Sequence, residues 1–245
     1  MQRQHYQIID ITRACAILLM FIYHFCFDLS NGGIVSINFN HSSFWLNFRI
    51  IIVSAFLLLV GVSLAIANSR ALNRKRFVIR LLLLALYSAL VSVSSYAMFP
   101  KSWIFFGILH FILVASILGL LFVKLYWLNL LFGFSLIVIG NILSFSAFDQ
   151  SYLQWVGLMT DKPITEDYVP LIPWFGVVLL GMFLGKLLFV KKSLSVSDKL
   201  MCWSSNHFVA RLFAFFGRHA IHVYMLHQPI FIGLISAALW LMPKA

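Results

Sequence analysis

The sequence predicts an all-α polytopic membrane protein: a transmembrane helical bundle of about seven spans with a cytoplasmic N-terminus. Of its 245 residues, 62% are hydrophobic and only 10% are charged, whereas a soluble domain carries about 25% charged residues. So few charges cannot cover a water-facing surface, but a lipid bilayer allows apolar side chains to face outward. We expect a single transmembrane domain over residues 1–245, surrounded by the lipid bilayer.

Seven apolar stretches come near the roughly 20 residues that a helix needs to cross a bilayer. They are Ile8–Leu29, Phe44–Ala67, Phe77–Phe99, Trp103–Val123, Tyr126–Phe148, Leu171–Val190 and Ile221–Met242. The first is not read as a signal peptide, because Asp10 and Arg13 interrupt its start and no small-residue cleavage site follows. A further segment, Leu200–Phe216, mixes aromatic and polar residues and predicts a helix at the inner membrane interface.

The basic residues predict the orientation and argue against nucleic acid as a partner. The net charge is +11, but the Lys and Arg residues lie between long apolar runs rather than in a nucleic-acid-binding patch. With the N-terminus inside, fourteen of the 18 Lys and Arg residues fall on the cytoplasmic side and four outside. This asymmetry is typical of the positive-inside rule.

Ionisable residues inside a span are costly and therefore mark candidate functional sites. The first span holds Asp10, Arg13, His24 and Asp28, which fall within an arc of about 60° on a helix. His24 and Asp28 are one turn apart, so the carboxylate could orient the ring as a general base requires. A hydrogen-bonded core pair without chemistry is the alternative. For Asp10 and Arg13 a structural ion pair is favoured.

Other polar residues have both structural and functional interpretations. His110 begins the fourth span, where a hydrogen-bonded core histidine is the simpler interpretation. In the seventh span His227 and Gln228 precede Pro229, whose ring frees a backbone carbonyl that polar neighbours would satisfy. Trp174 belongs to a set of tryptophans toward the outside, which indicates an aromatic belt or a surface on which a sugar stacks. The pair Gly181 and Gly185 predicts close helix packing.

The three cysteines and the histidines indicate neither a disulfide nor a metal site. Cys15 and Cys26 are separated by roughly 16 Å along one helix, which is too far for a disulfide. No CxxC motif or His/Cys cluster is present. We therefore expect no metal.

Five stretches, taken in order, resemble one protein family. They are IIDITRACAILLMFIYHFCFDL (Ile8–Leu29), FLLLVGVSL (Phe56–Leu64), FFGILHFI (Phe105–Ile112), PLIPWFGVVLLGMFLG (Pro170–Gly185) and FGRHAIHVYMLHQPI (Phe216–Ile230). Together they resemble the small bacterial membrane proteins grouped with the catalytic domain of heparan-α-glucosaminide N-acetyltransferase. The chain departs from the usual pattern at Ala14 and Ala220, where the family commonly has Gly and Ser, and both departures keep a small side chain.

The resemblance implies an integral membrane acyltransferase in the bacterial inner (cytoplasmic) membrane, with acetyl-CoA or another acyl-CoA as donor and a carbohydrate as acceptor. It implies a catalytic histidine in or just after the first span, which His24 fits best, with Asp28 as its orienter. We expect His110 to assist by hydrogen bonding. His41 is a rival, because NHSSFW (Asn40–Trp45) weakly resembles the stretch that holds the active histidine of the animal enzyme.

The expected acyl-CoA site lies at the cytoplasmic ends of the first and seventh spans. Arg13 and Arg218 would meet the phosphates of CoA, with Asp10 and His219 beside them, and His227, Gln228, Trp174 and His41 form a possible additional site. A proton-coupled transporter or flippase using the buried His and Asp residues stays open as an alternative, as does a subunit that only organises partners. Assembly into a homo-oligomer is also open.

Overall fold

The structure, a computed structural model, describes residues 6–39, 41–69, 73–191 and 196–241. Every regular element in these ranges is helical, which confirms the predicted all-α fold. The chain forms two compact units. The terminal unit comprises the described residues up to Phe56 and from Asp198 onward, and the central unit comprises Leu57–Ser197.

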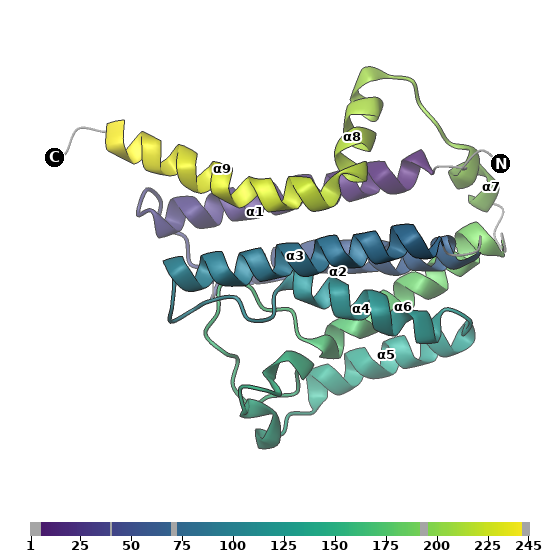
Figure 1. The fold of residues 1–245 in the computed structure, drawn as a ribbon, viewed down its shortest axis with the longest axis horizontal. Coiled ribbons are helices and arrows are strands. Elements are labelled where there is room, and N and C mark those ends of the chain that lie inside the picture. The colour runs from purple at the N-terminus through teal and green to yellow at the C-terminus, as the bar shows by residue number, and fades with distance from the viewer. Residues whose placement is uncertain (1–5, 40, 70–72, 192–195, 242–245) are drawn as a thin grey trace. The chain divides into compact units, whose positions relative to one another are not determined.

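The helices of each unit are shown in Figure 1. The terminal unit contains α1 (Gln7–Asn31), the first part of α2 (Ser43–Ser69), most of α7 (Val196–Cys202), α8 (Phe208–Arg218) and α9 (Ala220–Leu241). The central unit contains the rest of α2, α3 (Arg74–Met98), α4 (Ile108–Phe122), α5 (Trp127–Ile142), α6 (Leu171–Gly185) and the short elements η1 (Ser146–Asp149), η2 (Gln154–Val156) and η3 (Lys186–Val190).

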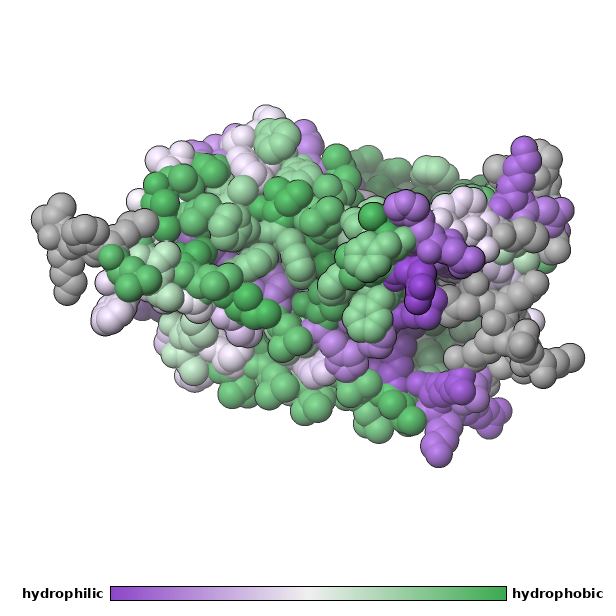
Figure 2. All heavy atoms as spheres, turned by 90° about the horizontal axis from the view of Figure 1, so that it is seen from above, coloured by the Kyte–Doolittle hydropathy of each residue, from purple (hydrophilic) through white to green (hydrophobic). Residues whose placement is uncertain are grey.

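The helices account for the predicted spans and support a multi-pass membrane protein. Among the described residues, α1, α2, α3, α9 and the continuous helix from Leu171 to Val190 are long and apolar enough to cross a bilayer. The two remaining predicted spans correspond to the shorter apolar helices α4 and α5. Apolar side chains cover much of the face seen in Figure 2, as expected for a surface in contact with lipid.

The two shorter helices end where loop residues form other hydrogen bonds. The predicted span began at Trp103, but α4 begins at Ile108, whose backbone N–H donates to the Asp167 carboxylate at 2.8 Å. At the far end of α5, the backbone N–H of Phe145 donates to the carbonyl of Leu158 at 2.7 Å. The helix therefore stops at Ile142 rather than continuing to Phe148.

In the terminal unit, α8 and α9 both pack along α1. A Cβ atom added at Gly217 would collide with the backbone of Asp10, so α8 approaches α1 at a position that only glycine allows. Farther along, Gly32 at the end of α1 lies against Ile235 of α9. These contacts bring the N-terminal span and the last two helices into one unit.

The prediction of one interfacial helix over Leu200–Phe216 is wrong, because residues 203–207 separate α7 from α8. Ser and Asn residues at 204–206 favour turns and caps over helix interiors. Gln7 also holds this break, since its side chain donates to the Ser205 carbonyl at 3.0 Å and accepts from the Ser205 backbone N–H at 2.7 Å. The chain thus turns before α8 begins.

In the central unit, glycines allow close contact between helices. A Cβ atom at Gly181 of α6 would meet the backbone of Leu58, and one at Gly185 would lie 2.9 Å from the Cα of Val62. On α2, Gly61 faces α6 in the same way. The predicted packing role of Gly181 and Gly185 is therefore confirmed.

Candidate functional site

One end of α1 carries a buried carboxylate between two arginines, which we call the arginine cluster (Asp10, Arg13 and Arg218). Arg13 Nη1 lies 3.2 Å from Asp10 Oδ1, and Arg218 Nε lies 3.2 Å from Asp10 Oδ2. Arg13 Nη1 also donates to the carbonyl of Gly217 at 3.0 Å. The expected Asp10–Arg13 ion pair is therefore present, and Arg218 joins it from 208 residues farther along the chain.

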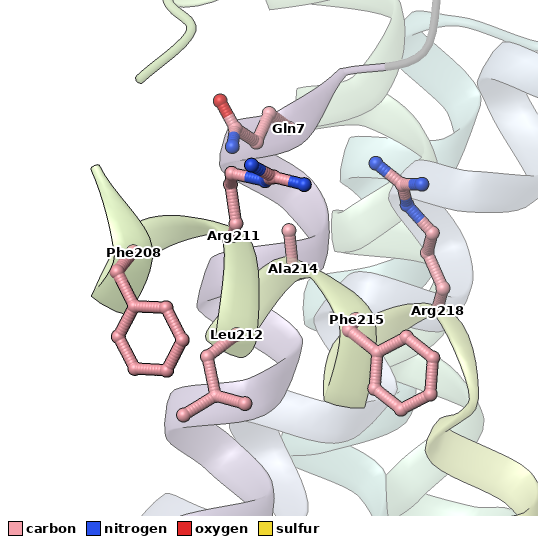
Figure 3. Close-up of a pocket in the computed structure, with 7 residues that line it drawn as sticks. All are labelled: Gln7, Phe208, Arg211, Leu212, Ala214, Phe215 and Arg218. Atoms are coloured by element: carbon pink, nitrogen blue, oxygen red, sulfur yellow. The ribbon is translucent and has the colours of Figure 1, made fainter. Parts of the chain in front are cut away.

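A hollow of about 410 Å³ opens beside the arginine cluster. Gln7, Arg211 and Arg218 contribute its polar lining, and Phe208, Leu212, Ala214 and Phe215 contribute its apolar lining. Figure 3 shows the two guanidinium groups on the side of α8 where Gln7 lies, with the two phenyl rings on the other side. The Arg218 side chain is 52% exposed, so it can pair with Asp10 and still face a ligand. This lining suits an anionic group attached to an apolar one.

Farther along α1, four polar side chains meet across α1 and α9, and we call them the histidine cluster (His24, Asp28, His227 and Gln228). The ring centroids of His24 and His227 are 5.0 Å apart. His227 is buried, and its ring stacks on Phe21 with centroids 5.5 Å apart. Along the axis of α1 the histidine cluster begins about 21 Å from Asp10.

Within this cluster Asp28 is bound by α9 rather than by its neighbour on α1. Gln228 Nε2 donates to both carboxylate oxygens of Asp28, at 2.9 and 3.1 Å. No hydrogen bond joins His24 to Asp28 or to any other residue in the described part of the chain. The predicted contact between His24 and Asp28 is thus replaced by the Gln228–Asp28 pair, and His24 lies instead beside His227.

His110 lies in the central unit, at the start of α4, in a saturated hydrogen-bond chain. Its Nδ1 accepts from the backbone N–H of Gly107 at 3.3 Å, so the ring proton is on Nε2. Nε2 lies 3.0 Å from Ser92 Oγ, and that hydroxyl donates to the Ile104 carbonyl at 2.7 Å. These bonds support the interpretation of His110 as a satisfied core histidine, and its predicted assisting role stays a prediction.

The remaining predicted site residues lie apart from the two clusters. His41 is exposed in the loop before α2, and its backbone N–H donates to Asn38 Oδ1 at 3.2 Å. His219 is exposed at the end of α8, where its ring Nδ1 lies 2.9 Å from the Phe215 carbonyl. Trp174 lies on α6, in the central unit. In the described ranges, no three His, Cys, Asp or Glu side chains are grouped as a metal site requires.

Two further residues, Arg211 and Gln7, line the hollow with Arg218 and were not predicted from the sequence. Arg211 and Arg218 are seven residues apart, so they share one face of α8 about 10 Å apart along its axis. Phe208, Leu212 and Phe215 follow a helical spacing on the same element. With the boundaries of α8 known, helical spacing would have placed Arg211 on the same face as Arg218.

Comparison with known families identifies the group to which the protein belongs. Residues 5–229 match the family model described as heparan-alpha-glucosaminide N-acetyltransferase, catalytic. The chain belongs to this family. Both clusters lie within the matched residues of the heparan-alpha-glucosaminide N-acetyltransferase family. No curated protein and no solved structure matches the chain.

Proposed function

We propose that this protein is an acyltransferase of the bacterial inner membrane. It would transfer an acyl group, acetyl by the family's name, from acyl-CoA on the cytoplasmic side to a sugar hydroxyl or amine at the outer face. The cytoplasmic placement of the arginine cluster rests on the Lys and Arg asymmetry of the sequence.

The observation that carries this proposal is the arrangement of the two clusters along one helix. The arginine cluster and its hollow offer guanidinium groups and apolar side chains at one end of α1. The histidine cluster offers imidazoles about 21 Å away along the same axis. A long substrate with an anionic end and a reactive end suits this separation, and acyl-CoA has that form.

The chemistry requires a proton acceptor beside the attacking group. In the proposed reaction His24 takes the proton of the sugar hydroxyl or amine as its oxygen or nitrogen attacks the thioester carbonyl carbon. The carbon–sulfur bond then breaks, and the protonated His24 returns the proton to the departing thiolate. Arg13, Arg211 and Arg218 would hold the phosphates, with Asp10 fixing two of these arginines.

The direct test is acetyl-CoA consumption by the purified full-length protein with methyl glucosaminide as acceptor. The proposal predicts release of free CoA together with acetylated glycoside, at a rate that depends on both substrates. Proton or solute flux into proteoliposomes without CoA release would favour the transporter alternative. No CoA release with hydroxyl-bearing or amine-bearing sugars would contradict the acyltransferase proposal.

A further inference from the structure

Two buried hydrogen-bond acceptors in the histidine cluster have no donor. Within the described residues, His227 Nε2 and Gln228 Oε1 are both inaccessible to solvent and both lack a hydrogen-bond partner. Buried polar atoms are nearly always paired, because an unpaired one loses its bond to water without replacement. Two such atoms on consecutive residues of α9 therefore need an explanation.

The hydrogen bond of Nδ1 determines which ring nitrogen of His227 carries the proton. Nδ1 of His227 is hydrogen-bonded to the backbone carbonyl of Tyr224. A carbonyl oxygen only accepts, so in the neutral ring Nδ1 carries the proton and Nε2 presents a lone pair. The residue is 5% exposed, and Nε2 itself is inaccessible to solvent.

The orientation of Gln228 is fixed in the same way. Its amide nitrogen donates to both oxygens of the Asp28 carboxylate. The reversed orientation would place the amide oxygen against a carboxylate and lose both bonds, so the assignment of Oε1 as the unpaired atom holds. Like His227 Nε2, this atom can only accept a hydrogen bond.

Because both atoms are acceptors, the group that completes them must bring hydrogen-bond donors. The acyl thioester group itself offers only a carbonyl oxygen, which is an acceptor and satisfies neither atom. The arm of CoA beyond the sulfur carries N–H donors, so the KM for acetyl-CoA in the test below distinguishes that occupant from the acceptor substrate. We propose that His227 Nε2 and Gln228 Oε1 bind the acceptor substrate through its hydroxyl or amino groups, beside the ring of His24. This inference rests on the proposed acyltransferase function and assigns the acceptor half of its site to α9.

The test uses the purified full-length protein with acetyl-CoA and methyl glucosaminide. His227→Phe keeps an aromatic ring on Phe21 but removes the acceptor atom, and Gln228→Met removes the other one. We expect each change to raise the KM for the glycoside by about tenfold, the usual effect of one lost hydrogen bond, while the KM for acetyl-CoA changes less than twofold. Leu234→Ala, at a lipid-exposed position of α9, is the control and should leave both KM values unchanged.

Thermal unfolding in detergent separates this role from a structural one. His227→Phe removes a buried unpaired acceptor together with the Nδ1–H bond to the Tyr224 carbonyl, and these two changes oppose each other, so its Tm should stay close to that of the wild type. A lower Tm with an unchanged KM for the glycoside would make His227 a purely structural residue and would overturn the inference.

Direct binding separates failure of this inference from failure of the proposed function. Methyl glucosaminide should bind the wild-type protein without acetyl-CoA, and His227→Phe should weaken its Kd by about tenfold. If binding shows this difference but no acetyl transfer occurs, the acceptor site stands and the proposed reaction fails. Equal binding to both proteins, or no binding to the wild type, would contradict the acceptor site.

Discussion

The two clusters on α1 differ in how completely their polar groups are paired. In the arginine cluster, Asp10 is bound by two guanidinium groups, and Arg13 also donates to the Gly217 carbonyl. In the histidine cluster, two buried acceptors have no donor among the residues that the structure describes. The first arrangement already holds α1 against α8, whereas the second is complete only when a donor-bearing group is present. Buried polar groups on one helix face can therefore have different roles, and pairing distinguishes them.

The largest expected effect is on the labelling of single cysteines by an impermeant reagent, because a residue on one side of the membrane reacts and a residue on the other side does not. In a variant without its three native cysteines, a cysteine at Ser69 should be shielded from an impermeant thiol reagent in intact cells, and one at Thr160 should react. The reason is the Lys and Arg asymmetry, which predicts that the end of α2 at Ser69 faces the cytoplasm. The reverse labelling would move the arginine cluster to the outer face and remove its proposed contact with cytosolic acyl-CoA.

The next effect concerns the contact between α8 and α1. Gly217→Val places a branched side chain against the backbone of Asp10, and we expect a loss of about 2–4 kcal/mol of stability, as for severe overpacking. Gly233→Val is the matched control on α9, because a Cβ atom there meets nothing within 4 Å. Denaturant titration in detergent measures the free energy of unfolding of both variants. Equal stability of the two variants would contradict the close approach of α8 to α1.

A smaller effect is expected for acyl-CoA binding at the hollow. Arg218→Ala should raise the KM for acyl-CoA by about tenfold, roughly 1.4 kcal/mol, with less change in kcat, because a phosphate contact acts in ground-state binding. Lys199→Ala changes an exposed basic residue of α7 and serves as the control for loss of charge. An unchanged KM for Arg218→Ala would exclude this residue from the donor site.

The smallest effect lies in the loop of the central unit and depends on pH. The Thr160 hydroxyl and backbone N–H both donate to Asp149 and lower the pKa of this carboxyl below its ordinary value of 3.8. The resulting stability is present above that value and is lost as the pH falls through the lower pKa of the folded protein. The Tm of Thr160→Val should therefore lie slightly below that of the wild type at pH 6, and the difference should shrink below about pH 4. A difference that is constant with pH would contradict this assignment.

The sequence predicts what depends on neighbours along the chain. Apolar length located the membrane helices, because a span must be apolar over its whole length. The Asp10–Arg13 pair was predictable because residues three apart face each other on a helix. The binding of Asp10 by Arg218 was not predictable in detail, since it depends on how α8 packs against α1 across 208 positions of sequence.

Dependence on packing between helices that are distant in sequence also explains why the observed contacts of the histidine cluster differ from the predicted ones. His24 and Asp28 are one turn apart, and helical spacing alone predicts that they meet. In the structure Gln228 offers two hydrogen bonds to Asp28, and His227 lies beside His24. The sequence showed that these four residues were candidates, but only packing of α9 on α1 determines which of them pair. The break between α7 and α8 likewise depends on Gln7, which is distant in sequence.

The most direct test of the account is the turnover of His24→Ala beside that of His41→Ala, with acetyl-CoA and methyl glucosaminide as substrates. Loss of a general base lowers kcat by about 10²–10⁴-fold, and we expect this loss for His24→Ala with an unchanged KM for acetyl-CoA. Asp28→Asn should lower kcat less, and His41→Ala should retain turnover near that of the wild type. All variants must unfold at the wild-type temperature in detergent. Full activity of His24→Ala with loss of activity in His41→Ala would place the base in the loop before α2 and contradict the assignment to the histidine cluster.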